Sequence, residues 1–309
     1  MNWTPTNRPQ PMTWSASAVT LLTAAFWGGT AVAVTFSIDH VPAIMSAGIR
    51  FFLASIFMFG WCRWQNVSLR LTKHGWKVAG WMGFLLFLQI GTFHWGIRQT
   101  SASHATVLIN TFVFWIAGIE HFILRTHRLD SSRLMGLACA AVGGLVIIVA
   151  NTPHSQTAAR DPVTLTGDLF LLASSIILAV KVIYTRHAVM RAEPTAVMFW
   201  HDLIGATLFF VCSPLVENVH LPSLIEAAQN PVTVTALLYQ GIVVSGFCFG
   251  VQAVLLTRYT AAQVAIYSVA TPLFGICFAY LFRGDPLSPW LILSGISVAT
   301  GIAIINRAG

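Results

Sequence analysis

The stretch RQTSASHATVLINTFVFWIAGIEHF at residues 98–122 returns in altered form as RYTAAQVAIYSVATPLFGICFAYLF at residues 258–282. At an offset of 160 positions, eight of the 25 aligned pairs are identical. The identical pairs are Arg98/Arg258, Thr100/Thr260, Ala102/Ala262, Ala105/Ala265, Thr111/Thr271, Phe114/Phe274, Ile116/Ile276 and Phe122/Phe282. This agreement is several times what the composition alone gives, so the two halves of the chain are predicted to be related copies.

The composition around this repeat is that of a membrane protein. Hydrophobic residues make up 56% of the 309 residues, charged residues make up 9%, and the mean hydropathy is +0.73. A soluble chain carries about 25% charged residues, because it must cover its surface with polar groups. Lipid must therefore form part of the solvent of this chain, which excludes a pair of soluble domains.

The apolar runs are long enough to cross a bilayer, which takes roughly 17–25 residues per helix. They predict an all-α integral membrane protein with about ten transmembrane helices, at 14–36, 42–61, 78–97, 102–124, 132–150, 166–186, 195–216, 232–256, 261–282 and 289–305. Residues 151–166 form the most polar internal segment. We therefore expect a first five-helix repeat at 1–150 and a second at 151–309, joined in one membrane domain.

The lysines and arginines outside the spans indicate the orientation, because short cytoplasmic loops carry an excess of both residues. With a cytoplasmic N-terminus, three of them fall outside, at Arg98, Arg160 and Arg283. The other twelve fall inside, at Arg8, Arg63, Arg70, Lys73, Lys77, Arg125, Arg128, Arg133, Arg186, Arg191, Arg258 and Arg307. Both termini are therefore predicted to be cytoplasmic. Because the basic residues form no stripe or arm, nucleic acid is not expected as a partner.

Five spans per half is an odd number, so the second half must enter the membrane in the opposite sense to the first. Such inverted repeats give many secondary transporters two conformations around one central site. The sequence therefore favours a secondary transporter that alternates access to a small molecule. A duplicated membrane scaffold without a transport role is the alternative.

The motifs resemble those of the EamA-type drug/metabolite transporter superfamily over essentially the whole chain. AAFWGGTAVA at 24–33 and VPAIMSAGIRFFLAS at 41–55, with Arg50, are similar to the first two helices of that family. TGDLFLLASS at 166–175 and SVATPLFGICFAYLFRGDPLS at 268–288 are similar to its sixth and ninth helices. The first half departs from the family pattern, because Phe112 replaces the expected proline and RTH at 125–127 replaces Gly-Glu.

The resemblance implies ten helices in two inverted repeats around a cavity lined by helices 1, 3, 4, 6, 8 and 9. Members move amino acids, nucleotide derivatives, sugars and other metabolites. Within the family, the chain looks like the YddG-type exporters of aromatic amino acids. A bacterial inner membrane, a monomeric protein and an exported amino acid with an aromatic or apolar side chain are the expectations; another metabolite or drug class is the alternative.

Charged groups at membrane depth are costly, so each is a candidate for function. Lys181 and Asp202 lie at matching depths on adjacent antiparallel helices, which predicts an ion pair that latches a cytoplasmic gate; snorkelling of Lys181 to the interface is the alternative. Arg50 is expected to satisfy carbonyls or an acid, with Asp168 as a possible partner. His94 and His201 are intramembrane candidates for a proton relay.

The predicted substrate site gathers polar and aromatic groups on the cavity helices. Asn110 and the pair Tyr267–Ser268 lie near matching midpoints of the two repeat-related helices, where such transporters place their substrate. The remaining candidates are Trp27, Gln89, Phe93, His94, Trp115, Ser174 and Tyr184. Trp27 is flanked by Gly28 and Gly29, which are expected to permit a close approach between helices. Aromatic walls suit a large apolar side chain, although lipid-facing filler is the alternative for each Phe or Trp. Pro272 is predicted to act as a hinge, because a proline frees a backbone carbonyl within a helix.

Other functions find less support in the sequence. Ser245 and His201 allow an intramembrane hydrolase, but Ser245 lacks a Gly-x-Ser-x-Gly context, so no catalytic residue is assigned. A receptor or channel is disfavoured by the lack of a selectivity filter or ring of charges. The five cysteines have no CxxC spacing and the histidines no HExxH spacing, so neither a metal nor a cofactor is predicted.

Overall fold

The computed structural model describes residues 12–124, 163–189, 192–259, 264 and 266–307, together with scattered positions between 131 and 146. Within these residues the chain forms helices and no strands. They are α1 (Trp14–Gly28), α2 (Thr30–Ile38), α3 (Ala43–Trp64), α4 (Lys73–Ile97), α5 (Ala102–Asn110), α6 (Phe112–Gly118), η1 (Ile119–Ile123), α8 (Leu165–Val189), α9 (Pro194–Val216), α10 (Leu221–Gln229), α11 (Pro231–Leu238), η3 (Tyr239–Cys248), α12 (Phe249–Leu256), η4 (Ile266–Ala270), α14 (Thr271–Phe278), η5 (Ala279–Arg283) and α15 (Pro289–Arg307).

Among the described residues, seven helical segments are long and apolar enough to cross a membrane. They are Trp14–Ile38, Ala43–Trp64, Lys73–Ile97, Ala102–Ile123, Leu165–Arg186, Pro194–Val216 and Pro231–Leu255. Two shorter apolar helices follow, at Thr271–Arg283 and Pro289–Gly301. The predicted helix at 132–150 lies largely outside the described residues, as does the start of the predicted helix at 261–282.

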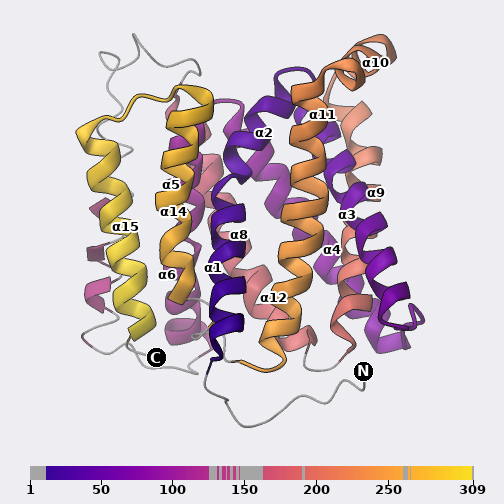
Figure 1. The fold of residues 1–309 in the computed structure, drawn as a ribbon, viewed down its shortest axis with the longest axis horizontal. Coiled ribbons are helices and arrows are strands. Elements are labelled where there is room, and N and C mark those ends of the chain that lie inside the picture. The colour runs from indigo at the N-terminus through magenta and orange to yellow at the C-terminus, as the bar shows by residue number, and fades with distance from the viewer. Residues whose placement is uncertain are drawn as a thin grey trace.

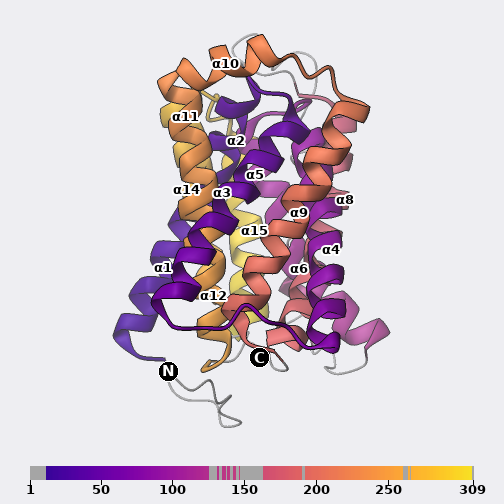
Figure 2. The same cartoon turned by 90° about the vertical axis from the view of Figure 1, so that its right-hand side faces the viewer.

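The helices run side by side and alternate in direction (Figures 1 and 2). The beginning of α1 and the end of α15 lie at one end of the molecule, and α10 lies across the other. We refer to these as the terminal end and the α10 end. Many large apolar side chains remain exposed on the outside of the bundle, such as Ile56 at 54% and Val211 at 61%. Such a surface suits contact with lipid.

The start of α4 and the presence of α10 differ from the sequence prediction. The helix predicted at 78–97 begins at Lys73. The Thr72 side chain caps it by accepting a hydrogen bond from the Gly75 backbone N–H. The first turn was missed because it is too polar to be recognised as part of a membrane span. The short helix α10 was not predicted. It begins with Pro222 in its first turn, a position where the missing N–H of proline costs no hydrogen bond.

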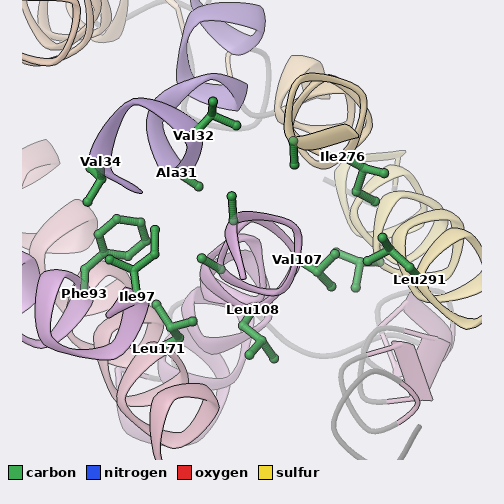
Figure 3. Packing of buried hydrophobic residues seen from close by; sticks show 14 of the residues in the cluster. Ala31, Val32, Val34, Phe93, Ile97, Val107, Leu108, Leu171, Ile276 and Leu291 are labelled. Atoms are coloured by element: carbon green, nitrogen blue, oxygen red, sulfur yellow. The ribbon is translucent and has the colours of Figure 1, made fainter. Parts of the chain in front are cut away.

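Helices from the two predicted halves pack against each other throughout the bundle. Helix α3 packs on α9, α5 packs on α14, and α4 packs on α8. The largest apolar cluster joins α2, α4, α5, α8, α14 and α15 (Figure 3). Its members include Val34, Phe93, Leu108, Leu171 and Ile276. The two halves therefore share one core.

Glycines allow the closest of these contacts. A Cβ on Gly28 would lie 2.7 Å from the Phe274 Cβ and 3.0 Å from the Gly275 backbone N on α14. A Cβ on Gly29 would lie 2.5 Å from the Tyr239 hydroxyl on η3. The expectation that these glycines next to Trp27 permit a close approach between helices is therefore met.

The Gly28 contact yields a stability prediction. Gly28→Ala is expected to destabilise the fold by about 1–3 kcal/mol, because the added methyl group meets the backbone of α14 as well as a side chain. Gly60→Ala on α3 is the matched control, since nothing lies within 4 Å of a Cβ there. Thermal unfolding in detergent measures both. Equal midpoints for the two variants would contradict the assigned contact.

Candidate functional site

Three charged side chains are buried together in the part of the bundle formed by α3, α4, α8, α9 and η3. Arg50, Lys181 and Asp202 are 2%, 5% and 0% exposed. Each of the three interacts electrostatically with the other two. Polar groups at this depth are expensive unless other protein groups satisfy them. We call Arg50, Gln89, Ser174, Lys181, His201, Asp202 and Ser245 the polar cluster.

Lys181 on α8 joins this cluster by a hydrogen bond to a side chain on α4. Its Nζ donates a hydrogen bond to Gln89 Oε1 at 3.2 Å. The Gln89 side-chain nitrogen donates in turn to Ser174 Oγ at 3.1 Å, and Ser174 donates to the Gln89 backbone carbonyl at 2.7 Å. Three residues that the sequence assigned to separate roles, Gln89 and Ser174 to substrate and Lys181 to a gate, therefore form one connected chain.

The predicted direct ion pair between Lys181 and Asp202 is not formed. Asp202 Oδ1 lies 2.9 Å from Nδ1 of its neighbour His201, and Asp202 Oδ2 has no hydrogen-bond partner. Lys181 and Asp202 interact through space without a contact within 4 Å. Matching depth on two helices does not determine the direction of a side chain about the helix axis, and here Lys181 turns toward α4. Snorkelling is also excluded, because Lys181 is buried.

Arg50 contacts η3 and not Asp168. Its Nε donates to Ser245 Oγ at 2.7 Å, and its Cζ lies 5.0 Å from the centre of the Phe51 ring. Its Nη1 is buried without a hydrogen-bond partner. Asp168 instead accepts from Thr100 Oγ1 at 2.8 Å and lies 3.3 Å from His104 Nδ1. The suggested Arg50–Asp168 partnership is therefore wrong.

Aromatic rings border the polar cluster on one side. Lys181 Nζ lies 5.0 Å from the centre of the Phe249 ring, within the range of a cation–π interaction. The rings of Trp27 and His201 lie 6.1 and 6.4 Å from the same ring. Phe249 therefore links Trp27 on α1 to the charged groups on α8 and α9. No sequence pattern distinguishes Phe249 from the other phenylalanines among the 21 in the chain.

His94 is fully buried next to this cluster, and it interacts electrostatically with Arg50. Its Nδ1 lies 3.1 Å from the Ile90 carbonyl, which can only accept, so Nδ1 carries the proton. The Nε2 atom is then an acceptor, and it has no partner. The neighbouring Phe93 belongs to the largest apolar cluster and is packed as a core residue.

The remaining predicted site residues lie on α5, α6, α8 and η4. Asn110 donates within its own helix to the Thr106 carbonyl at 2.7 Å. Tyr184 packs against a third apolar cluster, and Tyr267 and Ser268 are half-buried on η4. Trp115 is 39% exposed on the bundle surface. The matching midpoints of helices four and nine thus hold fewer buried polar groups than the polar cluster does.

Pro272 lies where the ninth predicted span changes its helical form. The 3-10 helix η4 ends at Ala270, and Pro272 stands in the first turn of α14. Its missing N–H therefore falls where a helix has no internal acceptor for it. The change from 3-10 to α-helix lies before the proline and not after it, and the hinge role of Pro272 stays a prediction.

The α10 end is tied together by carboxylates. Asp39 on the α2 C-cap accepts a hydrogen bond from the buried Arg283 at 2.7 Å. Glu217 accepts from the backbone N–H groups of Ile44 and Met45 at the start of α3, where the helix dipole favours a negative charge. A small cavity of about 150 Å³ opens beside the Asp39–Arg283 pair and is also lined by Ile97 and Arg98. A wider groove of about 810 Å³ near Arg63 and Arg70 lies at the terminal end and away from the polar cluster.

Several known proteins are similar to this chain in sequence. A sequence model of the EamA-like transporter family matches residues 14–149 and 165–307. A probable amino-acid metabolite efflux pump of Escherichia coli is 25% identical over 290 residues, which cover 92% of this chain and 92% of that protein. A protein of Salmonella typhimurium with the same description is 24% identical over 291 residues, with 92% of each chain covered.

Two further relatives extend the comparison. The uncharacterized transporter YoaV of Bacillus subtilis is 24% identical over 277 residues, covering 89% of this chain and 91% of that protein. A solved crystal structure shares the fold, with a TM-score of 0.70 at 18% sequence identity, and covers 95% of this chain and 98% of that one. Because the two matched segments together take up most of its length, this chain belongs to the EamA-like transporter family.

Proposed function

We propose that this chain is a secondary transporter that exports amino acids, with aromatic or apolar side chains favoured, by alternating access around the polar cluster. The observation that carries the proposal is the burial of Arg50, Lys181 and Asp202 inside a bundle of membrane-spanning helices. Charged groups inside a membrane are costly, and they usually mark the path of a substrate or an ion. Export of another metabolite or drug class is the second candidate.

The proposed architecture is ten helices in two inverted repeats, at 1–150 and 151–309. The pairing of helices supports it. If the repeats are related by a two-fold axis in the membrane plane, equivalent helices run antiparallel, and those next to the axis pack on each other. The corresponding pairs α3·α9 and α5·α14 are both in contact, and each pair runs antiparallel. The two separate matches to the family model point the same way.

The proposed location is a bacterial inner membrane, with both termini cytoplasmic and the chain acting as a monomer. The distribution of charge supports this orientation. Among the described residues, the α10 end carries Arg98 and Arg283. The terminal end carries Arg63, Arg70, Lys73, Lys77, Arg186 and Arg258. An excess of lysine and arginine marks the cytoplasmic side of membrane proteins.

The proposed cargo rests on two supports. Two relatives are described as probable amino-acid metabolite efflux pumps. In addition, the polar cluster combines charged groups with the rings of Trp27 and Phe249, and an aromatic amino acid presents the same combination of charge and ring.

Transport by the purified protein tests this proposal. Proteoliposomes are loaded with a panel of amino acids, sugars and nucleosides, and efflux is followed with and without a pH gradient. We expect efflux of phenylalanine and leucine to exceed that from protein-free liposomes, and sugars and nucleosides to stay at the background rate. Efflux confined to a different solute class would contradict the amino-acid assignment, and no efflux of any solute would contradict the transport function.

The Asp39–Arg283 pair is proposed to close the outward end of the path. It joins α2 to η5, and Arg283 is 4% exposed, so opening of this end requires the two side chains to separate. The cation–π contact of Arg283 with Phe36, at 5.0 Å, gives the closed position a further support.

Exchange of these two charges tests the closing role. Asp39→Arg and Arg283→Asp are each expected to lower the initial efflux rate in proteoliposomes, because two like charges then face each other in the closed state. The double variant with both charges exchanged is expected to recover most of the lost rate. Lys77→Gln is the control, because Lys77 is an exposed cation at the opposite, terminal end and its removal should leave the rate unchanged. A double variant as slow as the slower single variant would count against the pair as a gate.

A further inference from the structure

The charges of the polar cluster do not balance. Among the described residues, the cluster contains two cations, Arg50 and Lys181, and one carboxylate, Asp202. His201 and His94 lie in the same interior. With Lys181 protonated, Asp202 ionised and both histidines neutral, the two cations share one carboxylate. A buried charge without a counter-charge is strongly unfavourable, so an anionic group from outside the protein would be attracted to this position.

Several polar atoms at this position are also left without a protein partner. Arg50 Nη1 and the indole Nε1 of Trp27 are buried donors without an acceptor. Asp202 Oδ2 and His94 Nε2 are buried acceptors without a donor. Buried polar groups in folded proteins nearly always have partners, so such a group of exceptions calls for a ligand or an ordered water.

Donors and acceptors of this kind match the charged end of an amino acid. We propose that Arg50 and Lys181 bind the carboxylate of the transported solute, and that Asp202 Oδ2 accepts from its ammonium group. The carboxylate takes the acceptor position that Gln89 Oε1 now holds at Lys181 Nζ, and it supplies the missing acceptor for Arg50 Nη1. This inference rests on the proposed transport function and names the chemical groups that the solute must carry.

The present partner of Lys181 makes such an exchange feasible. Lys181 is held by one hydrogen bond from its ammonium group, to a neutral amide, at 3.2 Å. Replacing that amide by a carboxylate gives a charge-assisted hydrogen bond, which is about twice as strong as a neutral one. The Phe249 ring beside Lys181 and the Trp27 ring beside Phe249 then lie next to the side chain of the bound solute.

Three solutes that share one ring separate the two charged groups. Phenylalanine carries a carboxylate and an ammonium group, 3-phenylpropionate carries only the carboxylate, and phenylethylamine carries only the ammonium group. In proteoliposomes, Lys181→Gln is expected to lower the efflux of phenylalanine and 3-phenylpropionate by about tenfold or more. Efflux of phenylethylamine is expected to change little. Asp202→Asn is expected to give the reverse selectivity between the two single-charge solutes.

Two variants control for the fold and for surface charge. Arg50→Lys retains the charge and loses the second guanidinium donor. It should therefore lower the efflux of the two solutes that carry a carboxylate, without unfolding the protein. Lys77→Gln removes an exposed cation at the terminal end and should leave all three rates unchanged. Equal losses for the three solutes in Lys181→Gln, or no loss, would overturn the carboxylate site and leave the transport function standing.

A binding measurement covers the case in which wild-type protein transports none of the three solutes. The thermal midpoint of the detergent-solubilised protein is measured with each solute. Phenylalanine and 3-phenylpropionate are expected to raise the midpoint of wild-type protein and of Lys77→Gln, and not that of Lys181→Gln. A rise that is the same in all three proteins, or absent from all three, counts against the site. A failed transport assay together with selective stabilisation would overturn the proposed function alone.

Discussion

Two cations and one carboxylate are buried where α3, α4, α8 and α9 meet, and the packing of these helices depends on how the three charges are satisfied. Asp202 is the carboxylate, and it interacts with Arg50 and Lys181 from a distance while contacting His201. Ser245 and Gln89 supply the direct hydrogen bonds that the two cations make to the protein. Because hydrocarbon offers no such partners, the helices that carry these groups must stay together in any state in which the charges are buried.

Close contacts between helices also maintain this arrangement. The glycines at positions 28 and 29 bring α1 against α14 and η3, and Gly275 brings α14 against Thr106 on α5. Small residues at such crossings increase van der Waals contact, which is the main attraction between helices in lipid. Strong ties are found instead at the α10 end, where Asp39, Glu217 and Asp285 connect helix ends that are far apart in the sequence. The bundle is thus tied by charge at one end and packed by small residues along its length.

The structure combines helix ends that are held by carboxylates with a span of irregular helical form. Helix-capping carboxylates give the α10 end several charge-assisted hydrogen bonds, among them the one from the Ser103 backbone N–H to Asp285 Oδ2 at 2.9 Å. The ninth predicted span, in contrast, changes from a 3-10 helix through α14 to the π-helix η5. Irregular turns of this kind are frequent at functional sites. A transporter that alternates access needs a few such positions between rigid elements.

Much of the fold could be predicted because hydropathy and charge are properties of sequence position. The apolar runs predicted the helices α3, α9 and α15 closely, and the glycine pair after Trp27 predicted a close crossing. The start of α4 and the presence of α10 were missed, because capping by Thr72 and the amphipathic character of a nine-residue helix leave little trace in a hydropathy profile. The candidate site was predicted less well. Gln89, Ser174, Lys181 and Asp202 were selected, yet their mutual contacts were not.

The sequence by itself determined the membrane class of the protein, its helical character and the depth of each charged residue along its helix, because these depend on the order of residues along one axis. The tertiary structure decided which charges meet. Arg50 turns to Ser245 and Lys181 to Gln89, and neither contacts the acid that the sequence suggested for it. The physical reason is that the partner of a side chain depends on the rotation of each helix about its own axis, and this rotation is set by packing against all neighbouring helices at once.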